Sequence, residues 1–218
     1  MTFSLKITDA TFTKYIAQVP PYLSSAKMML LFGTDGTSST NNYVTGVGNA
    51  TVTGTPTYGT GFATFSPTAY IEAPMAARNI PFTYLGIVSS PTLGQSLFGS
   101  SITNIYMQSL GPNLFSDGGT RGGTAALPSG YSFVALTYEG SSAKIYIGNS
   151  GTVTAYTISY TGGVSGTGKF RVGGLVGSGT TFNAAATMVF ESVLTAGQIA
   201  DLYNYYRLTL PIRGITVL

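Results

Sequence analysis

Short segments in which apolar residues alternate with other residues recur along the chain, and they constrain the fold more than any other feature. The clearest example is 152–160 (TVTAYTISY). Two further strand-like segments are 168–175 (GKFRVGGL) and 131–138 (YSFVALTY), which is rich in aromatic and β-branched residues. Alternation of this kind is typical of β-strands, whose side chains point to opposite faces in turn. Turn residues separate such segments about every 8–12 residues, which favours an antiparallel sandwich. We therefore predict an all-β fold of two antiparallel sheets in a jelly-roll sandwich.

One segment near the end of the sequence, 191–207, has the period of a helix instead. Thr195 and Gln198 have the spacing of a capping box, in which each side chain satisfies a backbone group of the other residue. We predict one short C-terminal helix that packs on a sheet, with Tyr205 directed away from it, toward solvent or a neighbouring subunit. The apolar stripe of this helix consists of Ile199, Leu202, Tyr203 and Tyr206.

The pattern divides the 218 residues into three parts. Residues 1–26 are expected to be an N-terminal arm or anchoring segment, because a Pro-Pro and a Ser-Ser pair separate them from the main domain. Residues 27–207 are the predicted jelly-roll domain, and 208–218 a C-terminal strand or tail. The apolar residues of the tail alternate, so we expect it to be an exposed strand edge that a partner covers. Two stretches rich in glycine and serine, 33–42 and 111–130, are predicted loops. The arm alternates Phe3, Leu5 and Ile7, the predicted assembly contacts that could add a strand to a partner, together with Tyr205.

Charged residues make up only 8% of the chain, so threonine, serine, asparagine, glycine and tyrosine must cover much of the surface. The net charge of +3 comes from ten basic and seven acidic residues spread singly, with no run of Lys or Arg. This argues against nucleic-acid binding. The longest tight apolar run, Met28 to Phe32, is too short to span a bilayer, and no signal peptide is recognised. We expect no membrane insertion.

The residues of most catalytic machinery are missing from the sequence. Histidine and cysteine are absent, which excludes Ser-His pairs and thiolate metal sites. The closest two acidic residues are ten positions apart, so no strand carries a pair of carboxylates. We predict no catalytic, cofactor-binding or metal-ligating residues and no cofactor. A glycosidase pair assembled from separate strands stays as an alternative.

Binding residues are easier to find than catalytic ones. Within a Gly-rich segment that otherwise looks like a surface loop, Asp117 and Arg121 could form hydrogen bonds to sugar hydroxyls. A nearby tyrosine, Tyr106, could supply the flat apolar surface that sugars pack against. These three are the predicted glycan contacts. Asp35 is either part of an Asp-Gly turn or a calcium ligand.

Four motifs occur in an order that is similar to a known family. The first is 31–42 (LFGTDGTSSTNN) followed by 53–74 (TGTPTYGTGFATFSPTAYIEAP). The others are 131–149 (YSFVALTYEGSSAKIYIGN), 169–175 (KFRVGGL) and 188–203 (MVFESVLTAGQIADLY). Together they resemble the laminin-G-like, concanavalin A-like lectin/glucanase group of jelly-roll domains. The resemblance implies a jelly roll closed by a short helix. Members include lectins, glucanases, adhesion modules and structural domains of bacteriophage tails and capsids.

These observations lead to a functional hypothesis with two alternatives. We expect a non-enzymatic structural or adhesion component of a virus particle, a phage tail or capsid-decorating protein made in the host cytoplasm and located in the virion. Its expected partners are other virion proteins and further copies of itself, in a trimer or larger array, with a host-surface glycan as a further contact. The alternatives are a free-standing carbohydrate-binding module and a glycoside hydrolase of the same fold.

Overall fold

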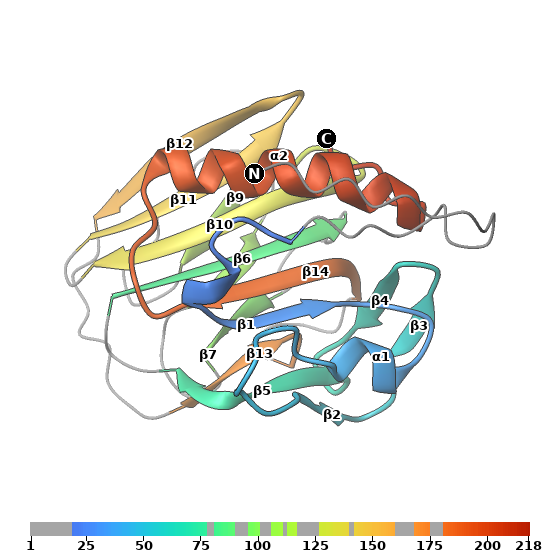
Figure 1. Cartoon of the computed structure of the whole chain (residues 1–218). Coiled ribbons are helices and arrows are strands. Elements are labelled where there is room, and N and C mark those ends of the chain that lie inside the picture. The colour runs from blue at the N-terminus through green and yellow to red at the C-terminus, as the bar shows by residue number, and fades with distance from the viewer. Residues whose placement is uncertain are drawn as a thin grey trace, which may run out of the picture.

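The computed structural model describes residues 19–77, 81–89, 96–100, 106–110, 113–116, 127–139, 142–159, 168–174 and 181–218. In this part of the chain two antiparallel sheets form a sandwich, and one helix near the C-terminus, α2 (Ala196–Thr209), lies along the larger sheet (Figure 1). The predicted fold class, an all-β jelly-roll sandwich of two antiparallel sheets with a short C-terminal helix, is confirmed.

Sheet A is the larger sheet, and β14 (Phe182–Phe190) is its most connected strand. The first residues of β14 pair with β4, its later residues pair with β1, and β6 runs along its other side. The other strands of sheet A are β12 (Thr152–Ser159), β11 (Ser142–Asn149), β10 (Tyr131–Glu139), β6 (Phe82–Ser89), β4 (Phe62–Phe65), β3 (Thr57–Gly59) and β1 (Ala26–Leu31).

Sheet B has six strands, again paired in antiparallel fashion. In order they are β2 (Thr51–Thr53), β5 (Tyr70–Ala77), β13 (Gly168–Val172), β7 (Ser96–Ser100), β8 (Tyr106–Leu110) and β9 (Asn113–Ser116). Strand β2 is thus one edge of sheet B, and β3 is one edge of sheet A. The two edges are joined in sequence, and the candidate functional site lies beside them.

Two apolar layers hold the sandwich together, because the central strands of sheet A are buried on both faces. In β10, Val134 and Leu136 face the core between the sheets, whereas Phe133 and Ala135 face the layer under α2. A strand covered on both sides should be apolar throughout rather than alternate with polar residues. This is why 131–138 is so rich in aromatic and aliphatic side chains.

Helix α2 is stabilised at its start and along its inner face. Thr195 and Gln198 form the predicted capping box, with the Thr195 amide donating to Gln198 Oε1 at 2.8 Å. The predicted apolar stripe is buried against sheet A. Tyr203 also bridges two other segments, since its hydroxyl donates to the Leu218 carbonyl at 2.5 Å and accepts from the Gly151 amide at 3.0 Å.

The C-terminal tail follows α2 and the 3-10 turn η3 (Leu210–Arg213). We expected the tail to be an exposed strand edge in need of a partner, and this expectation is wrong. Ile215 and Val217 are buried in the layer under α2, and the Leu218 amide donates to the Tyr131 carbonyl. The tail therefore pairs within its own chain, at the start of β10.

The start of the described chain is tied to the same helix. Tyr22 has a left-handed backbone (φ 63°), which is uncommon for a residue other than glycine. It precedes the 3-10 turn η2 (Leu23–Ser25), and its hydroxyl donates to the carboxylate of Asp201 on α2 at 2.5 Å. Among the described residues, no helix is long and apolar enough to cross a membrane.

The two stretches predicted as loops contain regular structure, which corrects both predictions. Residues 36–40 form the short helix α1 (Gly36–Thr40), and residues 113–116 form β9. Serine, threonine and glycine are poor helix formers, so α1 has no signal of its own in the sequence. It forms because Asp35 caps it, and because the Ser39 hydroxyl is fully buried and accepts from the Gly33 amide.

Candidate functional site

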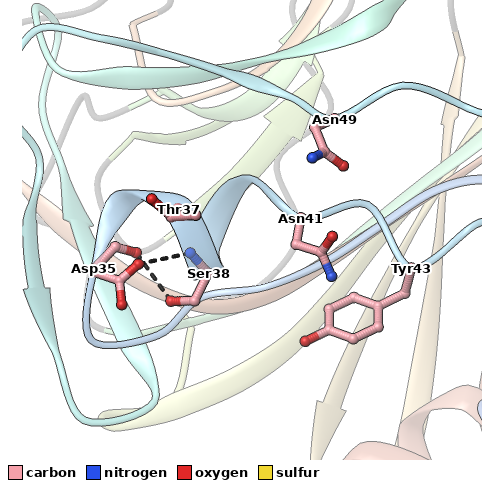
Figure 2. A pocket seen from close by; sticks show the side chains of 6 residues that line it. All are labelled: Asp35, Thr37, Ser38, Asn41, Tyr43 and Asn49. Carbon is pink, nitrogen blue, oxygen red and sulfur yellow. Dashed lines mark hydrogen bonds between the residues drawn. The ribbon is translucent and has the colours of Figure 1, made fainter.

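The segment after β1 turns back over the end of the sandwich and carries α1. Asp35 fixes the start of this helix: its Oδ1 accepts from the Ser38 amide at 2.7 Å, and the Ser38 hydroxyl donates to the Asp35 carbonyl at 3.1 Å (Figure 2). The hydrogen bond from the Ser38 amide lowers the pKa of the Asp35 carboxyl. Asp35 is therefore ionised at neutral pH. The turn predicted at Asp35 is the start of a helix, and calcium binding by Asp35 stays a prediction.

A buried amide holds the rest of this segment in place. The Asn42 Oδ1 accepts from the Met29 amide at 3.0 Å and from the Val44 amide at 3.1 Å. Its Nδ2 donates to the Gly48 carbonyl at 3.2 Å. One side chain thus connects β1 to both halves of the loop that follows α1. Such a network makes the loop a rigid support for the polar residues around it.

These residues surround an open depression of about 500 Å³, which we call the Tyr43 depression. Tyr43 is 46% exposed, although it is a large aromatic residue. In Figure 2 the side chains of Asn41 and Tyr43 extend to the same side of the ribbon, and Asn49 comes from the returning part of the loop. The lining consists of Asp35, Thr37, Ser38, Asn41, Tyr43 and Asn49.

The chemistry of the Tyr43 depression suits a polyhydroxylated ligand. It offers a carboxylate that only accepts hydrogen bonds, amides that both donate and accept, and hydroxyls that do either. The exposed Tyr43 ring adds a flat apolar face beside them. A sugar ring presents the same combination of hydroxyls and an apolar face, so the depression can match it in both respects.

The partners of the acidic side chains that the structure describes do not suit the hydrolysis of a glycosidic bond. Burial raises the pKa of Glu72, but hydrogen bonds and charges from Lys169 and Arg171 outweigh it, so its pKa is lowered. A general acid needs a raised pKa instead. Glu191 pairs with Lys27 at 3.6 Å, and Asp201 accepts from Tyr22.

The remaining described acid, Glu139, lines a separate small cavity of about 220 Å³ between the β10–β11 hairpin and the start of α2. Within the described ranges, no group of three or more His, Cys, Asp or Glu side chains could hold a metal ion. Asp9 and Asp117 lie outside these ranges.

Most residues that we predicted as contacts fall where the structure gives no side-chain positions. Asp117 and Arg121 lie outside the described residues, as do Phe3, Leu5 and Ile7. For Tyr106 only the backbone is described, at the start of β8, where it pairs with Gly99 of β7. The predicted glycan contacts therefore stay predictions.

Tyr205 is described, and it lies closer to the protein than we expected. Its side chain is half-buried, and its ring contacts the Tyr206 ring edge-on at 5.1 Å between centroids. Burial raises the pKa of its phenol, and the neighbouring Tyr43 makes a smaller contribution in the same direction. The Tyr205 side chain therefore lies on the side of α2 near Tyr43, and its role in assembly stays a prediction.

Sequence reasoning missed Asn41, Tyr43 and Asn49 as candidate ligand contacts. The stretch 33–42 is rich in serine and asparagine, a composition that indicates a loop and no more. The useful signal is the combination of two asparagines and a tyrosine at its end. The structure is needed to separate their roles. The Asn42 side chain is buried and bonds to the backbone, whereas Asn41 and Tyr43 on either side of it are exposed and line the depression.

The comparisons with known proteins place this chain among antiparallel β-sandwich domains. No family model matches the sequence, and no curated protein matches it. Among solved structures, domain 4 of AbnA, an extracellular GH43 arabinanase from Geobacillus stearothermophilus in complex with arabinotriose, matches with a TM-score of 0.58 and 16% identity. The match covers 82% of this chain and 98% of that domain.

Two further structures share the fold with parts of larger chains. A mutant Trypanosoma rangeli sialidase with trans-sialidase activity matches with a TM-score of 0.64 and 14% identity, over 86% of this chain and 34% of the sialidase. The binding domain of botulinum neurotoxin DC in complex with SialylT has a TM-score of 0.61 and 12% identity, over 86% of this chain and 53% of that one. At such identities the likeness establishes the β-sandwich fold alone.

Proposed function

We propose that this chain is a non-enzymatic carbohydrate-binding module whose ligand occupies the Tyr43 depression. The observation that carries the proposal is the grouping of an ionised carboxylate, exposed amides and a half-exposed tyrosine ring around one rigid depression. The fold likeness supports it, because the arabinanase domain was solved with arabinotriose bound and the neurotoxin domain in complex with SialylT. The ion pairing of Glu72 supports the absence of glycosidase activity.

The first experiment is a glycan array probed with the purified chain, followed by calorimetric titration of each glycan that binds. We expect Tyr43→Ala to weaken binding by about tenfold or more, because the ring contact and its hydroxyl are both lost. Tyr43→Phe keeps the ring, so the binding free energy that it loses should be less than half of the loss in Tyr43→Ala. The control is Leu208→Ala, since Leu208 is 72% exposed on α2 and does not line the depression.

The outcomes of this experiment separate the proposal from its alternatives. Silence on a broad array, or equal binding by Tyr43→Ala and the parent chain, would contradict a carbohydrate site in this depression. Products appearing when the bound glycan is incubated with the chain would contradict the non-enzymatic part of the proposal. If Leu208→Ala weakens glycan binding as much as Tyr43→Ala does, the binding site lies on α2 instead.

A second candidate is favoured by the composition of the chain. A surface in a chain with only 8% charged residues suits packing among other proteins, as in a virus particle. We propose as this second candidate a structural or adhesion component of a phage virion, which contacts other virion proteins or forms a trimer or larger array. Mass spectrometry of purified particles tests it, together with the oligomeric state in solution. Absence of the chain from intact particles would remove this candidate.

A further inference from the structure

A second open depression lies on the other side of α1, and we call it the Tyr58 depression. Its volume is about 730 Å³, and it is bounded by α1, by the edge strand β2 of sheet B and by Tyr58 of the edge strand β3 of sheet A. It therefore lies where the two sheets end side by side. In Figure 1, α1 lies beside β2 and β3 at this end of the sandwich.

The Tyr43 and Tyr58 depressions share a wall. Thr37 lines both of them, and it is exposed on α1. Helix α1 has five residues, little more than one turn, so the wall between the depressions is short. A ligand that occupies one depression can continue past Thr37 into the other without leaving the surface.

The lining of the Tyr58 depression is less polar than that of its neighbour. Val52 is 38% exposed and supplies apolar surface, while Ala50 and Pro56, both buried, lie beneath it in the lining. Threonines and the Tyr58 hydroxyl provide the polar groups. Burial raises the pKa of Tyr58, and the charge of Asp35 adds to the effect, so the phenol keeps its proton at neutral pH and can donate it in a hydrogen bond.

The electrostatics of both depressions select against acidic ligands. Among the residues that the structure describes, no lysine or arginine lines either one, so a ligand carboxylate or sulfate would find no cationic partner there. The charge in this described lining is the carboxylate of Asp35, which would repel an anion. A ligand with hydroxyls and no charge meets neither difficulty.

We infer that the two depressions are one continuous groove across α1 that binds an extended, uncharged oligosaccharide, with Thr37 at its middle. This inference rests on the proposed function, and it adds the length and the charge class of the ligand. The Tyr43 depression holds one part of the sugar chain through hydrogen bonds and the tyrosine ring. The Tyr58 depression holds the next part, mainly through contact with Val52 and the hydroxyl of Tyr58.

The test is a calorimetric titration of the full chain with unbranched neutral oligosaccharides of the arabino-, xylo- and gluco-series, from monosaccharide to hexasaccharide. Matching oligosaccharides that carry uronic or sialic acid are titrated in parallel. We expect affinity for the preferred neutral series to rise about tenfold between the monosaccharide and the longer members. The acidic counterparts should bind about tenfold more weakly than neutral ones of the same length.

Two variants locate the gain with length. Val52→Lys places a long charged side chain in the Tyr58 depression, and lysine is well tolerated on an edge strand. Thr55→Lys does the same from the loop between β2 and β3, in case the first variant disturbs folding. Each should abolish the gain with length while leaving the shortest ligand unaffected. Leu208→Lys, which adds the same charge on α2, should change neither.

The results distinguish this inference from the proposed function. If a short sugar binds and Tyr43→Ala removes it, but affinity is independent of length, the groove is wrong and the proposed function stands. The groove is likewise overturned if both lysine variants keep the full gain with length, or if acidic ligands bind as tightly as neutral ones. If no saccharide binds at any length, both proposals fail.

Discussion

In the described part of the chain two α-helices lie on this sandwich, and they differ in how their side chains are used. Helix α2 has fourteen residues, and its inner stripe is buried under sheet A. Helix α1 has five residues, and Ser39 is the one residue that it buries. Its exposed side chains are hydroxyls on the surface of two depressions. Helix α2 closes the fold, whereas α1 displays polar groups.

The difference also shows in how each helix is capped. Thr195 and Gln198 cap α2 without charge, while α1 depends on the carboxylate of Asp35. A short helix without an apolar face gains little from packing, so its cap and the network around Asn42 must hold it. We therefore expect the largest losses of stability from substitutions in α2, and the largest losses of binding from substitutions around α1.

The largest loss of stability is expected for Tyr203→Ala. The side chain is 1% exposed and packs against Phe133 with ring centroids 5.5 Å apart, so its removal leaves a cavity under α2. We expect the free energy of unfolding to fall by about 3–5 kcal/mol. Tyr203→Phe keeps the ring and loses the hydroxyl contacts to Gly151 and Leu218, at a cost of about 1–2 kcal/mol.

Chemical denaturation of the two variants, followed by circular dichroism, measures both values. A loss below about 1 kcal/mol for Tyr203→Ala would mean that the packing of α2 on sheet A contributes little to stability. The difference that we describe between α1 and α2 would then be wrong.

Asn42→Ala should have the next largest effect. It leaves the buried amides of Met29 and Val44 without their acceptor, so the free energy of unfolding should fall by about 1–3 kcal/mol. Glycan binding should be lost as well, because the loop that carries Asn41 and Tyr43 is no longer held. Asn204→Ala, on the exposed face of α2, is the matched control and should change neither property. Unchanged binding by Asn42→Ala would show that the loop does not need this support.

A smaller effect is expected when the pH is lowered, because the caps of the two helices should respond differently to acid. The pKa of Asp35 is lowered in the folded chain, so its contribution to α1 is present above the ordinary value near 3.8 and is lost as the pH falls through the folded pKa. The uncharged cap of α2 should not respond in this range. NMR titration of the Ser38 and Gln198 amides reads the two caps separately. A shift of Gln198 that tracks that of Ser38 would break the contrast, and Asp35→Asn should abolish the response at Ser38.

The smallest effect on stability is expected for Thr37→Ala. Thr37 is exposed, so its removal should change the free energy of unfolding by less than about 0.5 kcal/mol. Its position between the two depressions predicts a larger change in the affinity for long oligosaccharides than for short ones. Differential scanning calorimetry and titration of the same sample give both numbers. A clear loss of stability would assign Thr37 a structural role instead.

The same contrast explains what could be predicted from the sequence. Helix α2 is predictable because its apolar residues recur with a helical period and its cap has a recognisable spacing. Strands with clear alternation, such as 152–159, are predictable from their period of two, and 131–138 is predictable from its aromatic and β-branched residues. Helix α1 has no apolar stripe, and its glycine, serine and threonine residues have low helix propensity, so nothing in its composition distinguishes it from a loop.

The candidate site could be predicted only in part. Asp35 is recognisable as a turn residue or ligand, but its function as a cap depends on where the Ser38 amide lies in space. Asn41 and Asn49 come from opposite sides of a loop, and Tyr58 comes from another strand. Alternation predicts which residues share a face of one strand, but it does not predict which edges of two sheets lie together. For that reason the groove across α1 has no counterpart in the sequence.

The most direct test of a carbohydrate site at α1 is NMR mapping of the chain during titration with the neutral oligosaccharide that binds most tightly. We predict that amide signals of residues 35–58 shift in a saturable manner, while those of residues 196–201 at the start of α2 do not. Saturable shifts confined to α2, or to any surface away from α1, would contradict the account.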